Sequence, residues 1–224
     1  MEREVRREAD RANEMNAERQ AAEAVAAGSL VEAVGGIAAI ILAILGLLGL
    51  AAETLASIGV IVLGAAMLFE GTAILSRYSR LTRHESGGPE LTGGVTLEFI
   101  GGLSVLILGV LSLLTIATMT LLSIGVIAYG VTLILSAGTM TRLNAIDSYN
   151  QPYESNQAHL MSEAVVGSTA LQMLAGIGGV VLGILALIGV HGLTLILIAI
   201  LGLGAAILLA GSALSSRMLG VMRG

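Results

Sequence analysis

The sequence predicts an all-α integral membrane protein with six transmembrane helices, arranged as three tandem αα-hairpin repeats, and a charged N-terminal helix. The 224 residues are 55% hydrophobic and only 12% charged, whereas soluble domains carry about 25% charged residues. Long apolar runs recur along the chain, and residues in equivalent positions of these runs match at fixed offsets. This composition excludes a soluble globular enzyme and a disordered chain.

The first segment, residues 1–28, is predicted to be a charged cytoplasmic helix. Residues 2–27 consist largely of strong helix formers without Pro or Gly, and acid–arginine pairs such as Glu2 and Arg6 stabilise an exposed helix. Acids outnumber arginines in this segment, which makes it a poor match for an anionic membrane surface. It is either a solvated extension of the chain or a surface that docks a protein partner.

Six apolar runs are long enough to cross a membrane, which needs roughly 20 residues of helix. Strands are not expected, because membrane strands alternate polar and apolar residues over shorter segments. The first run is expected to be a span and not a cleavable signal peptide, because a long charged tail precedes it. The predicted spans are residues 33–52, 54–75, 99–118, 119–140, a stretch within 164–190, and 192–214.

The arginines predict the orientation of the spans. All 11 basic residues are Arg, and none lies in the turns after the first, third and fifth spans. If the helices alternate sides, every Arg falls on one face, which the positive-inside rule makes cytoplasmic. We expect both termini in the cytoplasm and the protein in the cytoplasmic (inner) membrane of a bacterium or archaeon. The predicted segments after residue 28 are hairpin 29–78, cytoplasmic loop 79–94, hairpin 95–142, cytoplasmic loop 143–163, hairpin 164–217 and cytoplasmic tail 218–224.

Matching glycines indicate that the hairpins are an internal triplication. Small residues four apart clear one helix face, so that a neighbouring backbone can approach closely. These faces either pack helices of one chain, which we favour, or form a homo-oligomer interface. The candidate packing residues are Gly35, Gly36, Gly64, Gly101, Gly102, Gly109, Gly130, Gly176, Gly179, Gly183 and Gly204.

Four polar residues are candidate intramembrane or ion-binding residues. Glu70 is the one acid well inside a span, where a charge costs on the order of 2.5–3.5 kcal/mol on insertion scales; it is either functional or pairs with Arg77. Glu32, Glu98 and Gln172 occupy one repeat position, at the start of the first span of each hairpin. This layer either binds a cation or selects ions at a pore mouth, or each residue caps its helix start, which we favour.

No combination of residues indicates catalysis. The chain has no Cys, three scattered His, and no paired carboxylates at a mechanistic spacing. We therefore expect no enzymatic activity, no cofactor, no resident catalytic metal and no nucleic-acid partner. His191 lies in a predicted outer turn, where it either senses external pH or is incidental.

A glycine-rich first helix, a short outer turn and the pattern Leu-x-x-Ile-Gly-Val-Ile-x-x-Gly resemble the HdeD family of small six-helix bacterial and archaeal membrane proteins. The resemblance covers roughly residues 32–217 and implies an acid-stress or envelope-associated role, with no catalytic residues. The residues that carry it are 36–47 with 58–61 and Gly64, then 102–113 with 124–127 and Gly130, then 176–187 with Ile198 and Gly204.

The predicted function is that of a non-enzymatic, structural or stress-associated multi-pass membrane protein that contacts the lipid bilayer and self-associates through its small-residue faces. One alternative is a channel or transporter for an ion or small solute that uses Glu70 or the layer of Glu32, Glu98 and Gln172. The spans lack embedded Pro and repeated charge pairs, which disfavours transport. A second alternative is an accessory subunit that docks a partner through residues 1–28.

Overall fold

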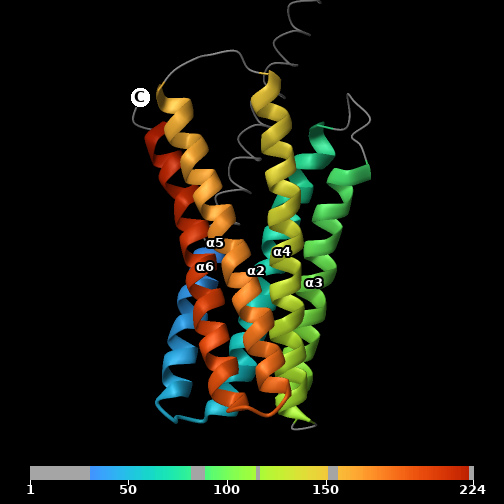
Figure 1. Cartoon of the computed structure of the whole chain (residues 1–224), viewed down its shortest axis with the longest axis vertical. Coiled ribbons are helices and arrows are strands. Elements are labelled where there is room, and N and C mark those ends of the chain that lie inside the picture. The colour runs from blue at the N-terminus through green and yellow to red at the C-terminus, as the bar shows by residue number, and fades with distance from the viewer. Residues whose placement is uncertain (1–30, 82–88, 115–116, 151–155, 222–224) are drawn as a thin grey trace, which may run out of the picture.

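The computed structural model describes residues 31–81, 89–114, 117–150 and 156–221. Side chains are described for residues 31–69, 97–114, 117–137 and 170–209. Within these ranges the chain is helical apart from short turns, and the helices run roughly parallel to the long axis (Figure 1). The first described helix is Val31–Leu47, followed by α2 (Ala52–Leu81), α3 (Pro89–Leu113), α4 (Thr118–Asn150), α5 (Asn156–Leu187) and α6 (Gly192–Val221).

Four of these helices are long and apolar enough to cross a membrane. The first described helix and the Leu97–Leu113 part of α3 are apolar but shorter. The structure is therefore all-helical, with four helices that have the length and composition of membrane spans. The four windows are Ala52–Phe69, Thr118–Ala137, Ala170–Leu187 and Gly192–Leu209.

A glycine in the left-handed conformation ends the first described helix. Gly49 has a φ of +86°, its N–H donates to the carbonyl of Gly46 (2.9 Å), and the N–H of Leu50 donates to the carbonyl of Leu45 (3.2 Å). These two bonds form a Schellman motif, which satisfies carbonyls left free at a helix end. Gly189, with a φ of +93°, ends α5 through the same pattern of bonds. The predicted first span reached residue 52, but the Schellman motif stops the helix at Leu47.

At the other end of the bundle, the helices are longer than the apolar runs indicate. The predicted loop 79–94 is wrong in extent, because α2 continues to Leu81 and α3 begins at Pro89. The predicted loop 143–163 is wrong in the same way, because α4 continues to Asn150 and α5 begins at Asn156. Hydropathy marks where a helix leaves an apolar environment, whereas backbone hydrogen bonding continues through polar helix formers. The predicted N-terminal helix, residues 1–28, lies outside the described residues.

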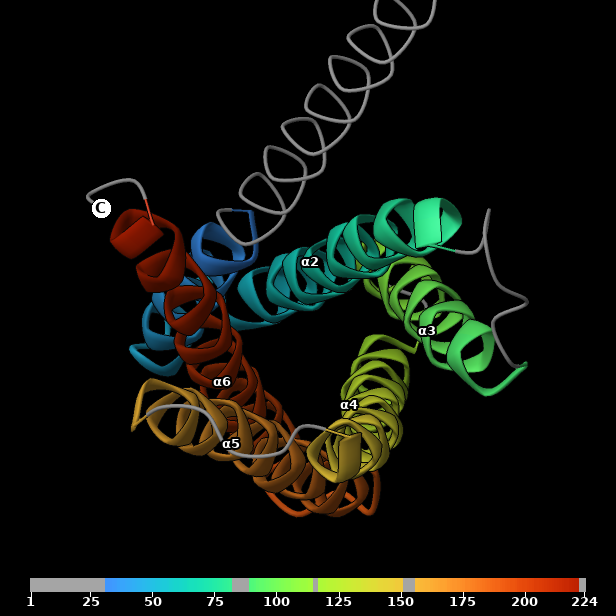
Figure 2. The same cartoon turned by 90° about the horizontal axis from the view of Figure 1, so that it is seen from above.

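Helices α2, α4 and α6 contact one another and supply most of the buried core. Figure 2 shows these three helices with the others placed around them. Each contributes large buried side chains, among which Leu63, Tyr129 and Leu203 are each 1% exposed. Further buried residues of one continuous cluster are Ala56, Val60, Met67, Leu122, Val126, Leu133, Ile196, Ile200 and Ile207. The centre of the bundle is therefore filled by apolar side chains.

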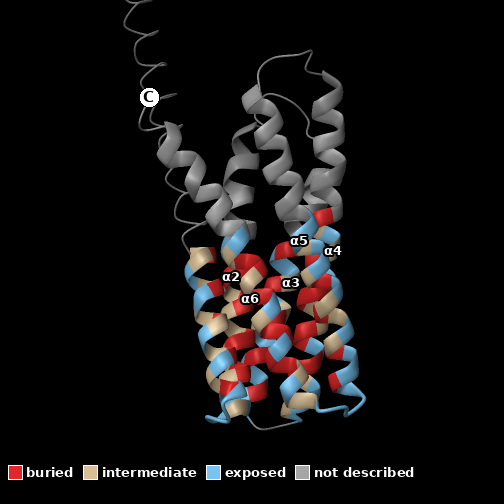
Figure 3. Ribbon diagram, turned by 60° about the vertical axis from the view of Figure 1, so that its left-hand side comes forward, coloured by how far each residue is buried: buried red, intermediate tan, exposed pale blue. Residues whose placement is uncertain are grey.

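The first described helix, α3 and α5 bury only one stripe each and expose the rest of their surface (Figure 3). Ile41 of the first helix is 51% exposed, and Ile100 of α3 and Leu174 of α5 are exposed in the same way. Apolar area on this scale is unfavourable in water and is typical of a surface covered by another apolar phase. The exterior of the bundle therefore fits contact with lipid.

Helices approach each other closely at three pairs of glycines. These pairs join α2 to α3, α4 to α5, and the first described helix to α6. A Cβ atom built on one glycine would lie so close to a carbonyl oxygen of the facing glycine that the backbone would have to move. These Cβ-to-oxygen distances are 3.0 Å for Gly64 to Gly102, 2.5 Å for Gly130 to Gly176 and 2.7 Å for Gly36 to Gly204.

The remaining candidate packing glycines also face neighbouring helices of the same chain. A Cβ on Gly35 would lie 3.1 Å from the Ala66 side chain, and one on Gly179 would lie 3.3 Å from that of Leu203. Gly101, Gly109 and Gly183 likewise meet residues of a neighbouring helix. The small faces identified in the sequence are therefore occupied within one chain, and they give no support to a homo-oligomer interface.

Substitution of Gly64 by Ala is expected to lower the free energy of unfolding by about 1–3 kcal/mol, because the new methyl group overpacks a backbone contact. A Cβ at this position would lie 2.6 Å from the backbone nitrogen of Leu106. The matched control is Gly178→Ala in α5, where a Cβ meets nothing within 4 Å, and Ala favours the helix. Unfolding of both variants in detergent, followed by circular dichroism, checks this, and equal stabilities would contradict it.

Substitution of Gly49 by Ala tests the Schellman motif separately from packing. A Cβ on Gly49 meets nothing within 4 Å, so the expected loss of about 1–2 kcal/mol comes only from the left-handed backbone. The control is Ala51→Gly, because Ala51 already has a φ of 39° and glycine removes that strain. In thermal unfolding, the Tm should therefore fall for Gly49→Ala and rise for Ala51→Gly. A Gly49→Ala protein with an unchanged Tm would contradict the backbone argument.

Candidate functional site

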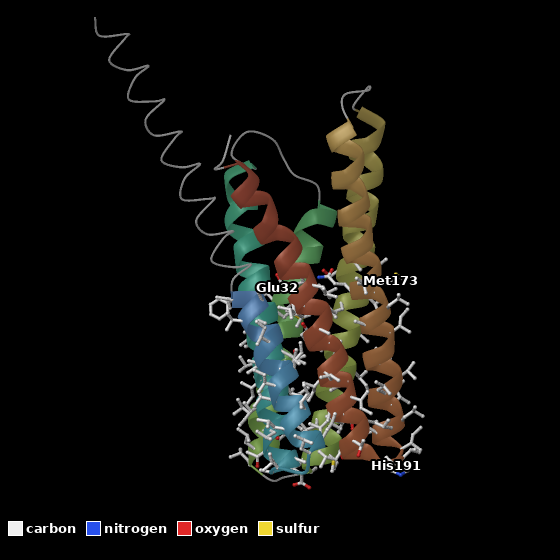
Figure 4. All side chains as sticks on the ribbon, turned by 90° about the vertical axis from the view of Figure 1, so that its left-hand side faces the viewer. Glu32, Met173 and His191 are labelled. Carbon is white, nitrogen blue, oxygen red and sulfur yellow. The ribbon has the colours of Figure 1, made fainter. Side chains whose placement is uncertain are left out.

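Two buried glutamates lie part-way along the bundle, where the described side chains end on the side away from the Schellman turns. Glu32, in the first described helix, is 3% exposed, and Glu98, in α3, is 4% exposed. Figure 4 shows Glu32 at one end of the described side chains and His191 at the other. The two helices present these residues inward because Glu32 and Glu98 each continue the buried stripe of their helix.

The Glu98 carboxyl group is held by one hydrogen bond. The hydroxyl of Ser136, in α4, donates to Oε1 of Glu98 and so joins the two helices of one hairpin. Oε2 of Glu98 and Oε1 of Glu32 are both buried and have no hydrogen-bond partner among the described residues. A buried polar atom without a partner costs roughly 1–3 kcal/mol, and more when it is charged. The pair is therefore incompletely satisfied by the described residues.

A charge on either carboxyl group would be costly at this position. Glu32 and Glu98 are each more than nine-tenths buried. Two like charges in a medium of low dielectric constant repel strongly, and each also loses its hydration. Neutralising these carboxyl groups would therefore lower the cost of burying them.

The other candidate polar residues take no described part in the hydrogen bond between Ser136 and Glu98. Gln172, the third member of the sequence layer, lies in α5 and is partly exposed. Glu70 and Arg77 lie in α2, but their side chains are outside the described residues. Whether Glu70 is functional or pairs with Arg77 therefore stays a prediction.

The favoured capping interpretation of the layer is wrong for Glu98 and Gln172. Because α3 begins at Pro89 and α5 at Asn156, both residues lie well inside their helices, beyond the first turn whose free N–H groups a cap would satisfy. The start of an apolar run marks where a helix enters an apolar environment and not where its hydrogen bonding begins. These side chains are therefore interior polar groups.

Sequence reasoning did not identify Ser136 as the partner of Glu98. The sequence does contain a feature that points to Ser136, because the alignment of the three repeats matches Ser136 with Glu70 and with Ala210. A polar residue at the same position of two hairpins indicates a second polar position near the first. The rotation of α4 relative to α3, which brings the hydroxyl to the carboxyl group, is not encoded in that alignment.

The hydroxyl groups deeper in the bundle are satisfied within their own helices. Each donates to a carbonyl oxygen three or four residues earlier, a bond that removes the need for water or a ligand. The bonds are Ser57 to Glu53 (2.9 Å), Ser112 to Gly109 (2.6 Å), Ser123 to Met119 (2.8 Å) and Thr132 to Ala128 (2.9 Å). The unsatisfied oxygens are thus found at the Glu32–Glu98 pair and not at these hydroxyl groups.

Comparison with known proteins identifies no relative of this chain. No protein-family model matches the chain, and no curated protein or solved structure matches it. The resemblance to the HdeD family therefore stays a prediction.

Replacement of Ser136 by Ala is expected to lower the free energy of unfolding by about 1–3 kcal/mol, because it removes the donor to a buried carboxyl group. The control is Ser104→Ala, whose hydroxyl donates only to its own helix, at Ile100 (2.7 Å), on an exposed face; such surface changes stay within about 0.5 kcal/mol. Chemical unfolding of both variants checks the difference. Equal losses would show that the Ser136 bond does not stabilise the bundle.

Proposed function

We propose that the protein is a non-enzymatic multi-pass membrane protein with a structural or envelope- and stress-associated role, and that its bundle does not conduct ions. The observation that carries this proposal is the apolar filling of the bundle centre. Leu63, Tyr129 and Leu203 come from the three inner helices, are almost fully buried, and belong to one continuous apolar cluster. An ion path needs polar groups or water, and hydrophobic constrictions block conduction by excluding water.

We further propose that the chain crosses the membrane six times as three tandem hairpins. The recurrence of glycine contacts at matching repeat positions supports this arrangement. The starts of α2, α4 and α6 support it too, because the preceding residues Ala51, Ala117 and His191 all have positive φ. Each of these residues also accepts the first hydrogen bond of its helix.

Both termini are proposed to be cytoplasmic, in the inner membrane of a bacterium or archaeon. Arg77 and Arg80 lie near the C-terminal end of α2, Arg142 in the last third of α4, and Arg217 near the end of α6. These helix ends lie at the end of the bundle opposite the turns that precede α2 and α6 (Figure 1), and clustered Arg favours the cytoplasmic side. Self-association stays part of the proposal, but it would have to use the outward aliphatic faces, since the candidate glycines pack within the chain.

A channel or transporter is the competing proposal, and the Glu32–Glu98 pair favours it. Unpaired ionisable groups inside a membrane protein often mark the path of an ion or proton. The pair lies part-way along the bundle, however, and the apolar cluster fills the described region between it and the Schellman turns. Docking of a partner through residues 1–28 concerns residues outside the described part of the chain.

Reconstituted liposomes are expected to show no proton or sodium flux above that of empty vesicles, at acidic or neutral pH, because the apolar centre excludes water. A fluorescent pH or sodium indicator inside the vesicles measures the flux, and circular dichroism shows that the protein is folded. Glu70→Gln and Glu98→Gln are compared with Glu53→Gln, which removes an exposed acid near the opposite end. Flux in the wild type that is lost in Glu70→Gln or Glu98→Gln but kept in Glu53→Gln would overturn the structural proposal in favour of transport.

A further inference from the structure

We propose that Glu98 is a buried proton-binding site, whose carboxyl group keeps a proton in the folded bundle and, as a neutral acid, joins α3 to α4 through Ser136. Glu98 is 4% exposed, and the hydroxyl of Ser136 donates to its Oε1. The other oxygen, Oε2, is buried and has no hydrogen-bond partner among the described residues. The site therefore consists of one carboxyl group and one hydroxyl group.

The hydrogen bonding of Glu98 fits the neutral form of a carboxyl group. A carboxylate only accepts hydrogen bonds, at about four lone-pair positions, whereas a carboxylic acid carries a donor of its own. The described residues supply one donor, the hydroxyl of Ser136, and an incompletely paired buried charge costs far more than a buried neutral group. With the proton on Oε2, Oε1 is the carbonyl oxygen that accepts from Ser136, and no charge remains to be compensated.

The turn of α3 that follows Glu98, toward the apolar core, is closely packed. A Cβ on Gly102 would lie 3.0 Å from the backbone nitrogen of Leu68 in α2, which leaves little room for water between these helices. On the other side, Thr132 of α4 lies against Gly101, but its hydroxyl donates within α4 (2.9 Å). The described side chains around this turn therefore offer Glu98 no second donor.

No described side chain of the helices packed against α3 neutralises a charge on Glu98. These helices are α2 and α4, whose described titratable groups are Glu53, in the first turn of α2, and Tyr129, in the apolar core. The described side chains include no Arg or Lys, and their one His, His191, lies at the far end (Figure 4). Glu32, the other buried acid, has the same sign of charge. The titratable groups of α2 and α4 whose side chains lie outside the described residues are Glu70, Arg77, Tyr78, Arg80, Arg142, Asp147 and Tyr149.

Occupancy of this site links the stability of the bundle to pH. In an unfolded chain a glutamic acid ionises at about pH 4.3, so that above this pH unfolding releases the proton of Glu98 to water. The folded state then binds one proton more than the unfolded state, and the free energy of unfolding falls as the pH rises. The stabilisation is complete below about pH 4 and is lost progressively until Glu98 ionises in the folded bundle.

Infrared difference spectroscopy of the full-length protein in lipid tests the protonation state directly. At neutral pH, the wild-type spectrum minus that of Glu98→Gln is expected to show the C=O stretching band of a carboxylic acid, which shifts in deuterium oxide. The matched control, Glu53→Gln, changes an exposed acid and should lose carboxylate bands instead. Loss of carboxylate bands alone in Glu98→Gln would overturn the proposal, because an arginine or another cation would then compensate a charged Glu98.

Thermal unfolding across a range of pH gives a second measurement. The Tm of the wild type is expected to fall as the pH rises from about 5 to 7, and Glu98→Gln should reduce this slope by about 3–5 °C per pH unit, the equivalent of one proton. Glu53→Gln should keep the wild-type slope. Equal slopes in the wild type and Glu98→Gln would contradict a neutral Glu98.

Ser136→Ala keeps Glu98 and serves as the test variant if circular dichroism shows that Glu98→Gln does not fold. Loss of the hydroxyl removes the hydrogen bond to the carbonyl oxygen, so the acid band should move to higher frequency without disappearing. An unmoved acid band, or its absence from the wild type, would contradict the proposed site. The site holds a proton and requires no conduction path, so the infrared result and the liposome flux test separate propositions.

Discussion

Close approach of helix backbones at glycine is the constraint on which this bundle depends. In a lipid environment the hydrophobic effect does not drive helices together, so association relies on dispersion contacts and interhelical hydrogen bonds. Gly64, Gly130 and Gly36 each bring a backbone against that of a neighbouring helix, and these contacts join the outer helices to the inner three. With the outer helices held there, the inner helices can fill the centre with larger side chains such as Tyr129.

The acidic pair lies next to this apolar centre and has a different energetic character. The core residues are satisfied by packing alone, and the deeper hydroxyls by their own helices, whereas Glu32 and Glu98 keep free buried oxygens. Retaining such groups is costly for a structural protein, because an apolar pair of similar volume is often as stable or more stable. That cost distinguishes the two acids from the rest of the described core.

Composition and repeats predicted the parts of this structure that depend on local sequence. The helical class follows from the apolar runs, and the importance of Gly36, Gly102 and Gly176 follows from their recurrence. Hydropathy could not predict that α2 continues to Leu81, because hydropathy reports which residues suit an apolar environment and not which residues form helical hydrogen bonds. Neither could it predict the bond from Ser136 to Glu98, which depends on the relative rotation of two helices.

The uneven burial of the helices affects how the protein relates to its surroundings. Only 22% of the apolar window of α5 is buried, against 44% in α2, α4 and α6. In a bilayer, acyl chains would therefore pack against much of the surface of α5. Bilayer thickness, and the match between this thickness and the apolar length of the outer helices, then contribute to conformational energy, since mismatch costs fractions of a kcal/mol per ångström. The same amino-acid sequence would thus differ in stability between thin and thick membranes.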